Sequence, residues 1–116
     1  MKILVAVDGS KSSLNAVKYA VKLASNFRTQ DRITLINVHD DQGLRHAQQF
    51  VGKEGVADYL RELSDKELKS ALAVLAKAGV KHDSIIQTGH VAEVISHAAD
   101  KKFDMVVMGS KGRSGL

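Results

Sequence analysis

The glycine-rich segment 109–116 contains the residues with the clearest potential for chemistry. It follows the apolar run Met105–Met108, as expected for a buried strand that opens into a turn. In parallel α/β sheets such a turn brings backbone N–H groups close to phosphate oxygens, because glycine has no Cβ to keep them apart. Gly109 and Gly112 are the glycines that would do this, with Ser110 between them. The pattern predicts an anion site; a plain strand-to-helix turn is the alternative interpretation.

Charged residues near this turn and at the end of the first strand have two interpretations each. Lys111 and Arg113 would either add positive charge at the phosphates or remain solvated loop cations. Asp8 follows the apolar run Ile3–Val7, where a carboxylate can accept from a ribose hydroxyl or face a phosphate-bound divalent cation. Its other role is to cap the next helix through an Asp-Gly turn. These two roles of Asp8 can coexist.

Other catalytic chemistries find little support. The absence of cysteine excludes disulfides, thiolate catalysis and zinc–thiolate sites. The serines at 10, 12 and 13 have no convincing His–acid partnership. The five histidines lack metal-ligand spacing, and most are expected on the surface or in loops. They are His39, His46, His82, His90 and His97. His90, directly after Gly89, is the one that could approach the site. We expect no dedicated catalytic apparatus, and the sequence leaves any metal unassigned.

Strand and helix patterns alternate along the chain, which predicts one α/β domain over residues 1–116 with a parallel sheet. Continuous apolar runs predict strands that are covered on both faces. The four expected strands are 3–7, 33–38, 84–88 and 104–108. The third is the most polar and among the shortest, so we place it at the sheet edge and the other three inside.

Three helices are expected between these strands. The first is capped by Ser10 or Ser12 and runs to about Phe27. Residues 40–55 show no clear period and are predicted to be a loop with possible helical turns. The pattern Ser64-x-x-Glu67 is a capping box, so the second helix starts either near Val56 or at Ser64, and Gly79 ends it. A short third helix covers residues 91–98.

Right-handed crossovers then favour the strand order 3-2-1-4 in a doubly wound sheet. The order of strands reverses between the first and the fourth, and ligands of such sheets bind at this switch point, beyond the carboxyl ends of the strands. Those ends are Val7–Gly9 and Met108–Ser110. The glycine-rich pattern and the topology therefore indicate the same site, beyond the carboxyl ends of the first and fourth strands.

Composition excludes several classes of function. The net charge of +4 comes from dispersed Lys and Arg, without a basic run interleaved with aromatics, so nucleic-acid binding is not expected. No apolar run approaches the roughly 20 residues that span a bilayer. The N-terminus has no signal-peptide cleavage pattern. We expect a cytoplasmic protein without membrane contact.

Four segments along the chain carry a resemblance to a known family: 3–10, 37–39, 88–89 and 104–112. Together they resemble the universal stress protein family, whose fold is a doubly wound sheet of five parallel strands with four helices. Its nucleotide-binding members carry G-x-x-G, then nine residues, then G-[ST]. Gly109 and Gly112 match the first part, whereas the second part would fall beyond Leu116.

The resemblance implies that the chain binds an adenine nucleotide, ATP with or without magnesium, with at most slow hydrolysis. It implies that Ala6 and Val7 line the adenine pocket and that the main chain of Val38 bonds to the adenine edge. The remaining expected contacts are Asp8, Met108, Gly109, Ser110, Gly112 and Arg113.

The resemblance also implies that the family's fourth helix and fifth strand are missing from these 116 residues. The last strand would then have an open edge, and such edges invite pairing with another chain. We therefore expect a homodimer, or a partner over this edge. Two alternatives remain open: a stress protein without nucleotide that acts as a dimerisation or partner-binding module, and another adenine-nucleotide domain such as a flavoprotein electron carrier.

Overall fold

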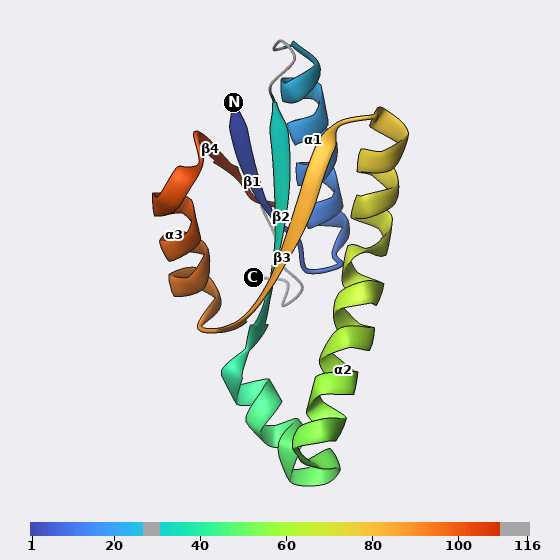
Figure 1. The fold of residues 1–116 in the computed structure, drawn as a ribbon, viewed down its shortest axis with the longest axis vertical. Coiled ribbons are helices and arrows are strands. Elements are labelled where there is room, and N and C mark those ends of the chain that lie inside the picture. The colour runs from blue at the N-terminus through green and yellow to red at the C-terminus, as the bar shows by residue number, and fades with distance from the viewer. Residues whose placement is uncertain (27–30, 110–116) are drawn as a thin grey trace.

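The computed structural model describes residues 1–26 and 31–109, and Figure 1 shows their arrangement. A four-stranded parallel sheet lies between helices, with α1 and α2 on one face and α3 on the other. The elements are β1 Lys2–Ala6, α1 Lys11–Asn26, β2 Arg32–Asp40, α2 Asp41–Ala78, β3 Lys81–Gly89, α3 Val91–Lys102 and β4 Met105–Val107.

The sheet has the order β3-β2-β1-β4, so the predicted strand order is confirmed. All three strand pairs are parallel, with Ile3 opposite Ile33 on one side and opposite Met105 on the other. The described residues place no strand on the outer side of β4. The carboxyl ends of β1, β2 and β4 therefore meet at one end of the sheet, where the switch point was expected.

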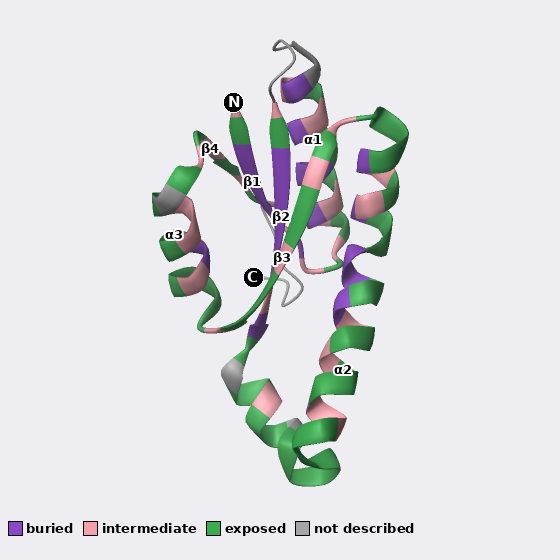
Figure 2. Ribbon diagram, viewed as in Figure 1, coloured by how far each residue is buried: buried purple, intermediate pink, exposed green. Residues whose placement is uncertain are grey.

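Each face of the sheet has its own core, because side chains alternate along a strand. On the α1 and α2 face, Ile3, Val5 and Leu35 pack with helix residues such as Val17 and Leu75. On the α3 face, Leu4 and Ile36 pack with Ile95. Figure 2 shows the buried residues concentrated in β1 and β2 and on the inner sides of the helices. The unbroken apolar run of β1 is explained by this burial on both faces.

The third strand differs from expectation in length, although its edge position is confirmed. The fourth strand, which was expected inside the sheet, is the other edge strand among the described residues. β3 covers residues 81–89, and β4, with three residues, is the shortest strand. Polar residues extend β3 because Asp83 accepts hydrogen bonds from Thr34 Oγ1 at 2.6 Å and from Arg32 Nη2 at 3.0 Å. An edge strand can keep such polar side chains in solvent while its backbone pairs with β2.

The first helix begins as predicted. Ser10 Oγ accepts from the Ser13 N–H at 3.1 Å, which confirms Ser10 as the N-cap. Phe27, the expected end of this helix, lies outside the described residues.

Residues 40–55, predicted to be a loop with possible helical turns, are mostly helical instead, because α2 already begins at Asp41. Asp40 caps it by accepting from the Gln42 N–H at 3.0 Å. At Gly52 the backbone leaves the helix (φ 72°, ψ 179°), and the chain doubles back, as the lower part of Figure 1 shows. Gly79 closes α2 in the left-handed conformation (φ 71°), as predicted.

None of the helices in residues 1–26 and 31–109 is long and apolar enough to cross a membrane.

Candidate functional site

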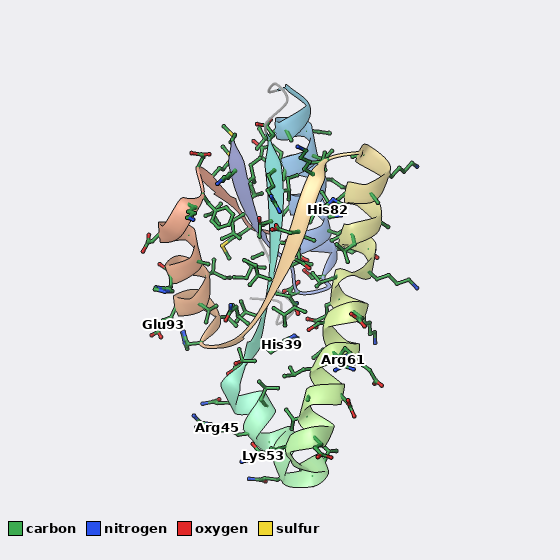
Figure 3. All side chains as sticks on the ribbon, in the orientation of Figure 1. His39, Arg45, Lys53, Arg61, His82 and Glu93 are labelled. Atoms are coloured by element: carbon green, nitrogen blue, oxygen red, sulfur yellow. The ribbon has the colours of Figure 1, made fainter. Side chains whose placement is uncertain are left out.

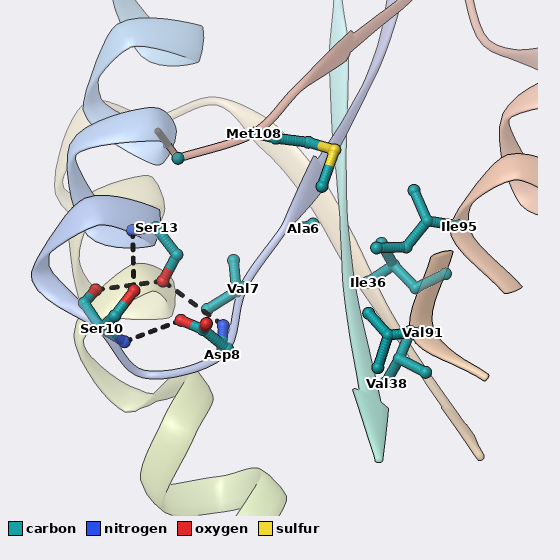
Figure 4. Close-up of a pocket in the computed structure, with 11 residues that line it drawn as sticks. Ala6, Val7, Asp8, Ser10, Ser13, Ile36, Val38, Val91, Ile95 and Met108 are labelled. Atoms are coloured by element: carbon teal, nitrogen blue, oxygen red, sulfur yellow. Dashed lines mark hydrogen bonds between the residues drawn. The ribbon is translucent and has the colours of Figure 1, made fainter. Parts of the chain in front are cut away.

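A cavity of about 190 Å³ lies at the carboxyl ends of β1, β2 and β4 (Figure 4). Six of the nine predicted site residues line it: Ala6, Val7, Asp8, Val38, Met108 and Gly109. The other three, Ser110, Gly112 and Arg113, lie outside the described residues, as does Lys111. Residues far apart in the sequence thus meet at the switch point.

Five further residues line this cavity that were not among the predicted site residues: Ser10, Ser13, Ile36, Val91 and Ile95. Val91 and Ile95 are one turn apart at the start of α3, so they face the same side of the helix. They give the cavity an apolar wall opposite the polar turn after β1 (Figure 4). The helical spacing of Val91 and Ile95, combined with the strand order, would have identified both as residues that line the site.

Asp8 sits in a network of hydrogen bonds that fixes the turn into α1 (Figure 4). Its Oδ1 accepts from the Ser10 N–H at 2.9 Å, and its own N–H donates to Ser13 Oγ at 3.3 Å. Gly9 between them has a φ of 86°, which favours glycine. Asp8 therefore holds the turn into α1, which is its expected capping role. It also borders the cavity, as a ligand contact would have to.

Gly109 needs to be glycine for a reason that was not anticipated. Its φ is not positive; instead, a Cβ at this position would lie 2.7 Å from the carbonyl carbon of Ser12 and 2.8 Å from its oxygen. The end of β4 therefore passes directly against the first turn of α1. This close approach brings the backbone at residue 109 to the edge of the cavity.

We predict that Gly109→Ala lowers the free energy of unfolding by about 1–3 kcal/mol, because the backbone of Ser12 cannot move aside easily. Urea denaturation measures the effect. Gly43→Ala is the matched control: a Cβ there meets nothing within 4 Å, and alanine favours the helix. Equal stability of Gly109→Ala and the unsubstituted chain would contradict the close packing.

A second, larger cavity of about 620 Å³ adjoins the first and shares Asp8, Val38 and Val91 with it. Its other walls come from the end of β2 and from α2. They are His39, Asp40, Gly43, Leu44, Tyr59, Leu63 and Glu67. The first cavity alone is smaller than the roughly 300 Å³ at which small-molecule sites usually begin, whereas the two together are large enough.

A buried polar network supports the switch point from the α2 side. Asn37 is fully buried, and its Nδ2 donates to the Val7 carbonyl at 2.8 Å and to Glu67 Oε1 at 3.0 Å. His39 Nε2 and Ser64 Oγ form a 2.7 Å hydrogen bond, also buried; Figure 3 labels His39 at this end of the sheet. These four side chains tie β2 to α2 and hold the carbonyl of Val7, which borders the candidate site.

This network corrects the predicted capping box and shows one histidine that departs from the expected surface or loop position. Ser64 and Glu67 do not form a capping box, because they lie inside α2 and face β2. His39 is not a surface residue: it is only 6% exposed. In both cases long-range hydrogen bonds decide the role of the residue, and no local pattern in the sequence reveals them.

The remaining histidines form no metal site with acidic residues in the part of the chain that the structure describes. His90 is the N-cap residue of α3 and lines a third cavity with Asp40 and Met108, beside the first. It thus comes near the candidate site without lining the first cavity.

Comparisons with known proteins agree with this architecture. The model of the Universal stress protein family matches residues 1–116. Universal stress protein MJ0531 of Methanocaldococcus jannaschii is 31% identical over 117 residues, which cover 99% of this chain and 67% of that protein. The solved structure of hypothetical protein MJ0577 has a TM-score of 0.73 at 26% identity, covering 99% of this chain and 78% of that one.

A structure of the universal stress protein family protein At3g01520 from Arabidopsis thaliana, solved with AMP bound, has a TM-score of 0.67. It is 21% identical and covers 98% of this chain and 79% of its own. At this identity the likeness extends to the fold alone.

Proposed function

The chain belongs to the universal stress protein family, and from this premise we propose that it binds an adenine nucleotide, ATP, at the carboxyl ends of β1 and β4. The observation that carries the proposal is the convergence of six predicted contact residues around one cavity at the switch point. The AMP bound to the Arabidopsis relative supports the choice of an adenine nucleotide.

The lining of the cavity suits the parts of such a ligand. Val38, Val91 and Ile95 offer an apolar surface for the base, with the main chain of Val38 available to the adenine edge. Asp8, which lines the cavity, would accept from a ribose hydroxyl or face a magnesium ion on the phosphates. The phosphates would extend from Gly109 towards residues 110–113. In this proposal the chain binds the nucleotide and hydrolyses it at most slowly.

Isothermal titration calorimetry of this chain with ATP and with AMP, each with and without Mg²⁺, tests the proposal. We expect saturable binding of both nucleotides and a higher melting temperature in their presence, because a ligand that binds only the folded state stabilises it. GTP is the control for recognition of the base. Failure of both ATP and AMP to bind would overturn the proposal.

A second candidate is a homodimerisation or partner-binding module. It is favoured by the outer edge of β4, which has no strand neighbour among residues 1–26 and 31–109, and by the exposed side chains of Val106 and Met108. Sedimentation velocity over a range of concentrations, with and without ATP, tests it. A monomer at every concentration, with and without ATP, would argue against this module. Nucleotide binding is measured independently.

A further inference from the structure

Residues 41–63 of α2 form a hairpin segment that stands outside the core of the protein. None of the side chains described between 42 and 63 is buried, whereas the next turns of α2 bury Ser64, Glu67, Leu68, Ala71 and Leu75. Figure 2 shows this lower part of the molecule as mostly exposed. A segment with so few buried contacts has little local stability compared with the core.

Both ends of the hairpin segment are held close to the candidate site. At its start, Asp40 caps the helix, and directly after its end Ser64 hydrogen-bonds with His39 of β2 at 2.7 Å. In between, Gly52 has a φ of 72° and a ψ of 179°, a backbone conformation that is essentially restricted to glycine. The segment is thus a glycine-turned helical hairpin attached to the sheet at its base.

One side of the hairpin segment forms a wall of the 620 Å³ cavity. Leu44 comes from its first arm, and Tyr59 and Leu63 come from its second. The facing residues, Asp8, Val38 and Val91, are those that the second cavity shares with the first. Tyr59 is still 48% exposed and Leu44 and Leu63 are only partly buried, so this apolar side has surface left to cover.

We propose that the hairpin segment closes over the bound nucleotide, with Leu44, Tyr59 and Leu63 as its contact face and Tyr59 as a positioning residue for the base. The inference rests on the proposed function and deepens it. A base that lies over Val38 and Val91 keeps its outer side towards the second cavity, where these three side chains cover it. Aromatic side chains supply large contact area with few rotatable bonds, which suits this role.

Hydrogen exchange followed by mass spectrometry tests the closure directly. Saturating ATP or AMP should slow exchange at amides of residues 41–63, because contacts to the ligand add stability to a segment that otherwise has little. Limited trypsin digestion gives an independent measurement, since Arg45, Lys53 and Arg61 lie in the segment (Figure 3). Cleavage there should become slower when the nucleotide is bound.

The substitution Tyr59→Ala provides the specific test. It should weaken ATP binding by about tenfold and remove most of the ligand-induced protection of residues 41–63. Phe50→Ala is the matched control, because Phe50 is an aromatic residue of the same segment that is 75% exposed and does not line the cavity. It should leave both affinity and protection unchanged.

Two outcomes separate this inference from the proposed function. If ATP binds but exchange and trypsin cleavage in residues 41–63 do not change, and Tyr59→Ala binds as tightly as the unsubstituted chain, the hairpin inference is wrong and the nucleotide proposal stands. If neither ATP nor AMP binds, both are overturned.

Discussion

Replacement of Asn37 by leucine is expected to lower the free energy of unfolding by about 2–5 kcal/mol. The fully buried Nδ2 group donates to the Val7 carbonyl and to Glu67 Oε1, and leucine removes both hydrogen bonds at once. Each acceptor then stays in the interior without this donor, and a buried polar group that loses its partner costs about 1–3 kcal/mol. Urea denaturation monitored by circular dichroism measures the loss.

Two controls show whether the network is responsible. Asn15→Leu changes the same residue type on the exposed side of α1 and should alter stability by no more than about 0.5 kcal/mol. The double variant Asn37→Leu/Glu67→Leu should be less destabilised than the two single variants predict together, because it removes a donor and its acceptor. Strict additivity would mean that the 3.0 Å contact between the two side chains contributes nothing.

The elements that the sequence predicted correctly are those whose signal is local or follows from topology. The apolar run 3–7 indicates a strand covered on both faces, and Ile3 and Leu4 indeed pack on opposite sides of the sheet. Gly79 closes its helix because glycine has no penalty in the left-handed conformation. The strand order required only the alternation of elements and right-handed crossovers.

Elements that were not predicted from the sequence mostly depend on contacts between distant residues. The polar start of β3 belongs to the strand because Asp83 is bonded by Thr34 and Arg32, about 50 positions earlier in the chain. Ser64 and Glu67 have the spacing of a capping box, but their partners are His39 and Asn37. The helix at 41–51 was missed for a different reason: none of its described side chains is buried, so its sequence shows no clear period.

The same distinction applies to the candidate site. Asp8 and Gly109 were predicted because each follows a strand at the switch point, where topology brings them together. Ala6 and Val38 were predicted from the resemblance to the family, and they line the same cavity. Tyr59, by contrast, reaches the second cavity only because the chain turns back at Gly52. No prediction that treats residues 40–55 as a loop can place it there.

The largest effect on ligand binding is expected at Asp8. We predict that Asp8→Ala weakens ATP binding by roughly ten- to a hundredfold, because a hydrogen bond to a charged group contributes about 1.5–3 kcal/mol. The same variant should also lose about 1 kcal/mol of stability, since Asp8 Oδ1 accepts from the Ser10 N–H at 2.9 Å. Calorimetric titration measures the first effect and urea denaturation the second.

Asp8→Asn separates these two roles of the side chain. The amide oxygen can still accept from Ser10, so stability should stay close to that of the unsubstituted chain, while loss of the negative charge should weaken ATP–Mg²⁺ binding by about tenfold. Asp104→Asn makes the same change in charge just before β4, at the opposite end of the sheet, where Asp104 Oδ2 accepts from the Lys2 N–H at 2.7 Å. It should bind ATP normally. Equal affinities of the two variants would mean that Asp8 serves the turn alone, and the ligand contact would then have to come from the residues after Gly109.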